Sequence, residues 1–288
     1  IKISKYFLQS VIIYIFFIVI RIVGLKVSRS FFSYIFNIIG PLIKSEQTVN
    51  NNLEKFLGFY NQDVKKQIKT EMWSNYGKTF VEYLYLKKLK NTSTHIEVKG
   101  EEVLNKIKKN NKPVIFVSGH FANFELMSME LTKRNINLAT IYRPLNNFFI
   151  NPFMEYLRKK YICQNQIKKG LAGVKESINY VKNNFSVALM IDQRVSEGKR
   201  LPFFGHMALT TTLPAQMALK FNLDIVPIYI ARKKNDTFQI EIYNPLKITN
   251  KDDNETNKLN ISIKLNKILE EMISRDPGQW IWTHNRWK

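Results

Sequence analysis

Continuous apolar runs alternate with amphipathic stretches through most of the chain beyond residue 95. The runs at 113–119, 185–192 and 224–232 are rich in branched residues, which is typical of strands buried on both faces. Between them, apolar residues three and four positions apart predict helices. We therefore expect an α/β fold with a largely parallel central sheet flanked by helices. The expected helices are 123–134, 146–161, 170–184, 210–222 and 259–280, and further strands are expected at 95–100, 136–143 and 238–246.

The first third of the chain is different, because its pattern is helical without strands. Residues 6–20 are apolar apart from Gln9 and Ser10, and a second apolar stretch follows at 31–43. A full membrane span needs roughly 20 apolar residues, so the first stretch is short unless its basic flanks extend toward the lipid headgroups. We expect residues 1–43 to form a membrane anchor and an interfacial helix, with a buried helical hairpin as the alternative. Residues 45–90 are also expected to be helical. Residues 44–288 form the second expected domain, which carries the site.

The charge of the chain narrows the classes of partner. There are 44 Lys and Arg against 23 Asp and Glu, a formal charge of +21, which favours acidic proteins, phosphorylated lipids, an anionic membrane face or nucleic acid. The chain is also rich in Lys, Asn and Ile throughout, so part of this charge can be compositional. The basic residues are spread along the sequence without an aromatic stacking motif or a helix-turn-helix pattern. We therefore expect no nucleic-acid binding.

Cysteine and histidine are too few for a metal site of the usual kind. Cys163 is the single cysteine, so no intramolecular disulfide is possible. No histidine lies near Cys163 in the sequence that could activate it as a nucleophile. The four histidines and one cysteine show no zinc spacing. We expect neither a metal nor another cofactor.

Three chemically capable side chains stand just beyond expected strands. They are His120, Arg143 and Asp192, and ligands in parallel sheets bind at the carboxyl ends of strands. Each residue also has a plainer interpretation. His120 could be a core histidine bonded to the backbone, Arg143 a surface ion-pair partner, and Asp192 an acceptor for turn amides.

The spacing of His120 and Glu125 suggests a pair. On a regular helix five residues place two side chains about 140° apart, so they cannot meet there. They can meet if His120 lies on the turn before the helix and Glu125 in its first turn, although Glu125 could merely cap the helix. A carboxylate that holds one imidazole nitrogen makes the other more basic. Such a base can take a proton from a hydroxyl, which is typically worth about 10²–10⁴ in rate.

The stretch "HFANFE" resembles the H-x4-D/E signature of the lysophospholipid acyltransferase superfamily. Six blocks, in order, resemble the bacterial lipid A late acyltransferases: "GHFANFE", "YRPLNN", "DQR", "PFFGHMALTTTLPAQMA", "DIVPIYIAR" and "PGQWIWTHNRWK". The resemblance spans essentially the whole chain and implies a glycerolipid acyltransferase-like fold. It implies transfer of an acyl chain from acyl carrier protein or acyl-CoA to a hydroxyl of a phosphorylated glycolipid, such as a Kdo-bearing lipid A precursor. The implied location is the cytoplasmic face of the bacterial inner membrane.

The resemblance also implies roles for residues. His120 would be the general base and Glu125 its orienting partner, without a covalent enzyme intermediate. Arg143 would stabilise the thioester oxyanion or hold a substrate phosphate, and Asp192 would complete the polar cluster. Arg286 in the tail could bind lipid phosphate, while the tail tryptophans lie near the membrane interface or pack inside.

The chain departs from the family pattern after the "DQ" block. The usual glycine-rich stretch is shortened to "RVSEGKRLPFFG", and Arg194 replaces a second acidic residue. These changes leave the acceptor open, so another glycolipid or a lysophospholipid is the alternative. A non-catalytic basic protein that binds membrane or nucleic acid is the remaining alternative.

Overall fold

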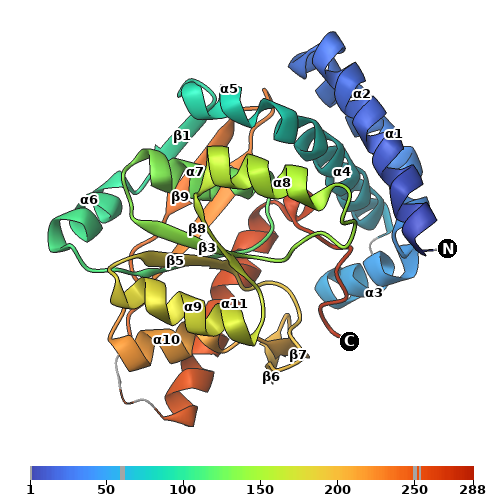
Figure 1. Ribbon diagram of the computed structural model, residues 1–288. Coiled ribbons are helices and arrows are strands. Elements are labelled where there is room, and N and C mark those ends of the chain that lie inside the picture. Colours follow the sequence, from blue (N-terminus) through green and yellow to red (C-terminus); the bar gives the residue numbers. More distant parts are fainter. Residues whose placement is uncertain (1, 59–61, 249–251, 253) are drawn as a thin grey trace.

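A seven-stranded sheet forms the centre of the molecule. The computed structural model describes residues 2–58, 62–248, 252 and 254–288. The strand order is β1-β9-β8-β2-β5-β3-β4, and neighbouring strands run parallel except for the antiparallel pair β8 and β9 (Figure 1). This sheet confirms the expected α/β fold. Its strands are β1 Ile96–Lys99, β2 Ile115–Ser118, β3 Leu138–Tyr142, β4 Asn165–Lys168, β5 Ser186–Met190, β8 Ile225–Arg232 and β9 Phe238–Ile242, and a separate hairpin holds β6 Lys199–Phe203 and β7 His206–Thr210.

Helices cover both faces of the sheet (Figure 1). The longer ones are α1 Lys2–Val23, α2 Leu25–Ile43, α3 Glu46–Leu57, α4 Gln62–Glu82, α6 Glu101–Asn110, α7 Glu125–Lys133, α8 Asn151–Leu157, α9 Leu171–Lys182, α10 Leu213–Phe221 and α11 Glu255–Arg275. Shorter turns of helix are η1 Tyr83–Tyr85, α5 Leu86–Asn91, the π-helical η2 Arg158–Ile162 and η3 Pro277–Gln279.

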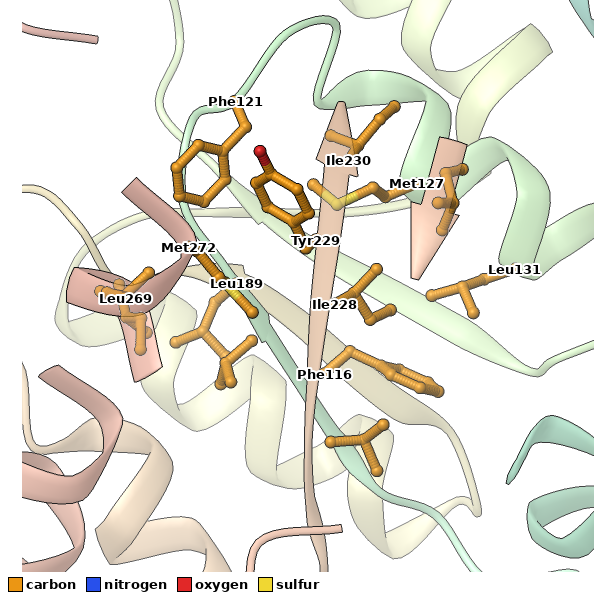
Figure 2. Close-up of a cluster of buried hydrophobic side chains, with 14 of the residues drawn as sticks. Phe116, Phe121, Met127, Leu131, Leu189, Ile228, Tyr229, Ile230, Leu269 and Met272 are labelled. Atoms are coloured by element: carbon orange, nitrogen blue, oxygen red, sulfur yellow. The ribbon is translucent and has the colours of Figure 1, made fainter. Parts of the chain in front are cut away.

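The core lies on both sides of β2 and β8. Every residue of β8 is buried, which explains why its sequence shows no polar alternation. Figure 2 shows Met127 and Leu131 of α7 on one side of these strands, and Leu269 and Met272 of α11 on the other. The sheet is therefore fixed between two helical layers, and its strand ends are held at defined positions.

The two N-terminal helices lie side by side at the edge of the molecule, next to α4 (Figure 1). They are joined at Gly24, whose φ of 90° is a left-handed conformation that favours glycine. The backbone of α2 approaches α4 so closely that a Cβ on Gly77 would lie 2.1 Å from the carbonyl oxygen of Phe32. Among the described residues, α1 is the one helix long and apolar enough to cross a membrane, which by itself is weak support for a span.

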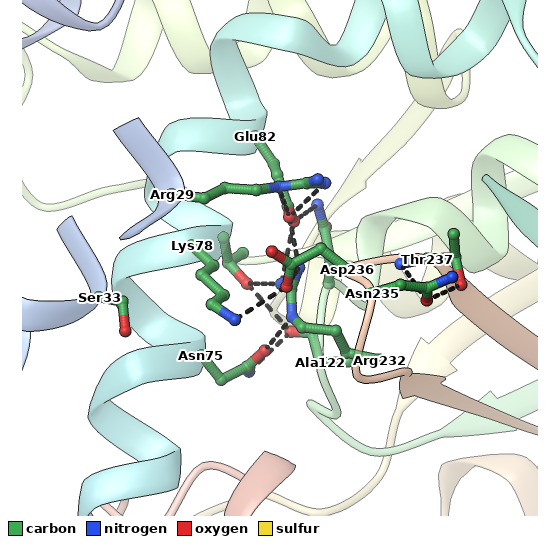
Figure 3. Close-up of polar contacts among 12 residues, drawn as sticks. Arg29, Ser33, Asn75, Lys78, Glu82, Ala122, Arg232, Asn235, Asp236 and Thr237 are labelled. Atoms are coloured by element: carbon green, nitrogen blue, oxygen red, sulfur yellow. Dashed lines mark hydrogen bonds and ion pairs between the residues drawn. The ribbon is translucent and has the colours of Figure 1, made fainter. Parts of the chain in front are cut away.

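A buried ionic network ties α2 to the rest of the fold (Figure 3). The carboxylate of Glu82 accepts hydrogen bonds from Arg29 Nε at 2.8 Å, from Asn123 Nδ2 at 2.9 Å and from Arg232 Nη2 at 3.1 Å. Glu82 is completely buried, and both arginines are nearly so. Removing one partner from such a cluster leaves an uncompensated charge, which is strongly destabilising. The predicted domain boundary at residues 43 and 44 stays a prediction, although α2 packs firmly on α4.

Several elements differ from the sequence expectations. β4, the β6–β7 hairpin and α6 were not expected, because each is short and carries many polar residues. The predicted helical segment 45–90 is divided into four helical pieces, the first ending at Gly58 with φ 72°. Residues 59–61 of that segment lie outside the described part of the chain.

Candidate active site

The turn after β2 brings His120 and Asp192 together. β2 and β5 are neighbours, and their register pairs Ser118 with Met190. Because the strands run parallel, the residues two positions beyond this pair, His120 and Asp192, leave the sheet at the same edge. A Cβ on Gly119 would lie 2.8 Å from the ring of Phe121 and 3.3 Å from Asp192 Oδ2, so only glycine fits this turn without displacing a neighbour.

Three hydrogen bonds hold the carboxylate of Asp192. His120 Nδ1 lies 2.8 Å from Oδ1, while the His120 amide and the Trp280 indole each donate to Oδ2 at 2.8 Å. Burial alone would raise the pKa of Asp192, but the charge and hydrogen bonds of His120 and the indole bring it down to about 2. An ionised carboxylate only accepts, so in the neutral imidazole Nδ1 carries the proton and Nε2 the lone pair. The arrangement makes Nε2 available as a base.

Glu125 has other partners than the one expected. It begins α7, as the sequence predicted, but its Oε1 accepts from the Tyr83 hydroxyl at 2.7 Å and from Arg158 Nε at 2.7 Å. The expected pairing of Glu125 with His120 is not formed, because the strand register gives Nδ1 to Asp192. Burial and the charge of Glu125 raise the pKa of Tyr83, which keeps this phenol protonated as a donor.

Two cavities meet at His120. The first, of about 340 Å³, is almost entirely apolar and is lined by Ile13 and Phe17 of α1 and Phe36 of α2, among others. The second, of about 500 Å³, has mixed walls, in which polar and charged side chains stand among apolar ones. Both are lined by His120, Phe124, Leu145 and Ile281. The histidine therefore faces an apolar compartment and a second one that also carries polar and charged groups.

Cations line the second cavity. Arg143 directly follows β3 and Lys169 directly follows β4, and the two strands pair Tyr142 with Lys168. Arg143 and Lys169 are thus neighbours on adjacent strands, and burial together with the charge of Arg143 lowers the pKa of Lys169. The ion pair of Arg158 with Glu125 also lies on this wall, with Arg158 Nη2 2.6 Å from Oε1. Two adjacent cations suit an anionic group such as a phosphate.

Arg286 lies outside both cavities. Its side chain is fully buried, with Nη1 donating to the Leu209 carbonyl at 2.6 Å and Nη2 to Thr210 Oγ1 at 2.8 Å. Burial lowers the pKa of this guanidinium to about 10. It holds β7 to the tail and lines neither of the two cavities, so the expected contact with a lipid phosphate is incompatible with its position. Trp280 and Trp282 are likewise buried, which matches the packing alternative for the tail tryptophans.

The tail supplies two residues that the sequence did not single out for the site. Trp280 pairs with Phe121 through a β-bridge and reaches Asp192, as described above. His284 lines the second cavity, and its Nε2 accepts a hydrogen bond from the Arg194 amide at 2.9 Å. An amide can only donate, so the ring proton of His284 is on Nδ1. No local pattern could reveal these contacts, because the hydrogen bonds of Trp280 and His284 join residues 88 and 90 positions apart.

The fold and the site define an α/β protein with a strand-end histidine–aspartate pair between an apolar and a cationic cavity. A family model described as Bacterial lipid A biosynthesis acyltransferase matches residues 1–288, and the chain belongs to this family, as its sequence blocks predicted. The chain is also similar to Lipid A biosynthesis acyltransferase 2 of Shigella flexneri. The two are 24% identical over 189 residues, and the match covers 64% of this chain and 58% of that protein. The chain therefore aligns with little more than half of this relative's length.

Proposed function

We propose that this protein transfers a fatty acyl group from a thioester to a hydroxyl of a phosphorylated glycolipid during lipid A assembly. The donor is acyl carrier protein or acyl-CoA, and the acceptor is a Kdo-bearing lipid A precursor. One observation carries the proposal: His120, poised by Asp192, stands where an apolar cavity meets a cationic one. An acyl chain and an anionic acceptor need such adjoining compartments, with a base between them.

The chemistry follows from the tautomer of His120. Nε2 takes the proton of the acceptor hydroxyl while the oxygen attacks the carbonyl carbon of the thioester. The tetrahedral intermediate then expels the thiolate as the carbon–sulfur bond breaks, and the imidazolium returns the proton to sulfur. Asp192 stabilises the imidazolium between these steps, as a buried carboxylate does for other catalytic histidines. The enzyme forms no covalent bond to the acyl group.

The remaining side chains divide between the two substrates. The apolar cavity receives the acyl chain. Arg143, with Lys169 beside it, holds a substrate phosphate or the developing oxyanion. Glu125 acts through its contact with Arg158, which it fixes on the wall of the second cavity. The net charge of +21 attracts an acidic carrier protein and a phosphorylated lipid, which suits work at the cytoplasmic face of the bacterial inner membrane.

The direct test uses the purified full-length chain. It is incubated with a Kdo-bearing lipid A precursor and, in parallel reactions, with acyl carrier protein or coenzyme A loaded with defined acyl chains, and the mass of the lipid product is measured by mass spectrometry. We expect a gain of one acyl group, and a loss of about 10²-fold or more in turnover for His120→Ala. His206→Ala is the matched control, because this exposed histidine begins β7 and lines neither of the two cavities. No mass gain with either donor would refute the proposal.

The acceptor needs its own experiment. Mass spectrometry of lipids from a strain that lacks the gene should show lipid A species short of one acyl chain. Accumulation of a lysophospholipid or another under-acylated glycolipid would instead favour the alternative acceptors, with the same chemistry at His120.

A further inference from the structure

The outer faces of α1 and α2 are apolar. Besides Tyr14, which bonds the Phe149 carbonyl, ten large apolar side chains of α1 are exposed, and on α2 an exposed stripe repeats every three or four residues. The stripe lies on one side of α2, and the ten side chains of α1 extend over about half of its circumference. The residues of this outer face are Ile3, Phe7, Leu8, Val11, Ile12, Ile15, Ile18, Val19, Ile22 and Val23 on α1, and Val27, Phe31, Tyr34, Ile38, Leu42 and Ile43 on α2.

The charges around this outer face are all of one sign. The first acidic residue of the chain is Glu46, whereas Lys2 and Lys5 begin α1, Arg21 and Lys26 flank the hinge, and Lys44 follows α2. Exposing an apolar surface of this extent to water would cost free energy. Its basic border complements an anionic lipid surface. The occupant that fits is the headgroup–acyl boundary of an anionic bilayer.

The inner face of α1 is attached to the catalytic domain along most of its length. Asn147 Nδ2 donates to the Tyr6 carbonyl at 2.9 Å near one end, and the Tyr85 hydroxyl donates to the Ile20 carbonyl at 3.0 Å near the other. Between them, the Tyr14 hydroxyl donates to the Phe149 carbonyl at 3.0 Å. These attachments extend over about 20 Å of helix.

A spanning helix cannot keep these attachments at low cost. The hydrocarbon core is about 30 Å thick, so elements fixed along α1 would be carried into it together with their polar surface. The residues beside α1 include the half-buried Asn147 at one end and the cationic Lys87 and Lys88 at the other. Lying flat avoids this cost, because only the outer face then enters the lipid.

We propose that α1 and α2 lie together in the plane of the membrane surface, with the outer face in one leaflet, and that α1 does not cross the bilayer. The proposal is independent of acyl transfer. It places the first cavity, which both helices line, at the level of the acyl chains, so a chain can reach His120 without passing through water.

Cysteine accessibility tests the proposal, because the chain has the single, buried Cys163. In a Cys163→Ser background, Lys5→Cys and Lys26→Cys mark the two ends of α1. Each full-length variant is produced in bacteria, and inverted and right-side-out inner-membrane vesicles are treated with a membrane-impermeant maleimide. Lys109→Cys, on the exposed face of α6 far from α1, reports which side the catalytic domain occupies (Figure 1).

We expect all three cysteines to react in inverted vesicles and none in right-side-out vesicles. If Lys5→Cys and Lys26→Cys react from opposite sides, α1 spans the membrane and the proposal is wrong. A polarity-sensitive dye on Ile12→Cys or Phe31→Cys should shift to the blue on anionic vesicles, while the same dye on Lys109→Cys should not. A dye that stays in a water-like environment at both positions would exclude lipid contact by the outer face. Apart from the shared Cys163→Ser change, the substituted side chains are exposed, so each variant should unfold at the temperature of the Cys163→Ser parent in detergent.

Discussion

At the scale of single residues, the carboxylate that orients the proposed base His120 belongs to Asp192, whereas the sequence spacing pointed to Glu125. The H-x4-E spacing suggested Glu125 as the partner of His120, whereas strand-end reasoning had already placed Asp192 at the same edge of the sheet. The second argument was the better guide, because it follows from parallel register. Which strands are neighbours is a tertiary fact, and so the pairing itself was not predictable from the sequence.

Asp192→Asn should lower kcat by about 10²–10⁴-fold, because an amide neither fixes the Nδ1–H tautomer nor stabilises the imidazolium. The measurement is steady-state acyl transfer, with the melting temperature recorded for each variant. Asp224→Asn is the matched control, since this exposed aspartate precedes β8 outside the two cavities. Unchanged kcat in a folded Asp192→Asn protein would remove Asp192 from the mechanism.

His284 should make folding stability depend on pH. Burial is the main cause that lowers the pKa of His284 from 6.5 to about 4. The charges of His120, Arg286 and Lys169 lower it further, and the charge of Asp192 raises it. The unfolded chain therefore binds the proton first, so stability falls as pH drops from about 6.5 to about 4. His284→Gln keeps an acceptor for the Arg194 amide but does not titrate. Between about pH 7 and pH 4.5 the wild type should lose more unfolding free energy than this variant.

Urea unfolding at the two pH values measures this difference. The comparison between wild type and variant removes the contributions of other groups that titrate in the same range. Equal losses in the two proteins would mean that His284 is not held neutral in the folded state.

At the scale of elements, long apolar strands and regular helices were predictable, and short polar ones were not. β2 and β8 pair their apolar pattern with burial on both faces, and β5 is buried apart from the half-buried Ala188 and Met190, so sequence and environment agree. β4 has the sequence NQIK at the edge of the sheet, and β6 begins with exposed Lys199 and Arg200. Such strands are specified by neighbours rather than by their own hydrophobic pattern.

The N-terminal helices should influence which acyl chains are accepted. Ile13 lines the apolar cavity, whereas its neighbour Ile12 projects about 100° away around α1 and is exposed. Ile13→Trp should shift the preference toward shorter donors, because the larger side chain fills part of the cavity. The measurement is kcat/KM for a series of acyl carrier protein thioesters, with Ile12→Trp as the control. The same chain-length profile in Ile13→Trp and wild type would place the acyl chain elsewhere.

At the scale of the whole molecule, the sequence defined the class of fold but not the order of strands. The alternation of strands and helices predicted a parallel sheet. The antiparallel hairpin of β8 and β9 departs from it, and the pairing of β1 with β9 joins strands far apart in the sequence, which leaves no local signal. The position of the first two helices was also open. They form part of the cavity wall and of the core, as well as the face proposed to contact lipid.

Deleting residues 1–43 should release the protein from membranes and also destabilise it. The deletion removes Arg29 from the buried carboxylate of Glu82, and breaking such a pair typically costs about 3–5 kcal/mol. Flotation with anionic vesicles and urea unfolding measure the two effects. Circular dichroism of the truncated protein is needed to confirm that it folds. A folded truncated protein that still binds the vesicles would show that another surface makes the contact.

The position of Trp280 has a consequence for protein synthesis. Its indole completes the set of donors around Asp192, and its backbone pairs with Phe121 in the turn that carries His120. Every strand of the sheet precedes Trp280 in the sequence, so the centre of the sheet can assemble on the ribosome before this last brace has been synthesised. A nascent chain interrupted before that point would bear every strand of the sheet and yet be inert.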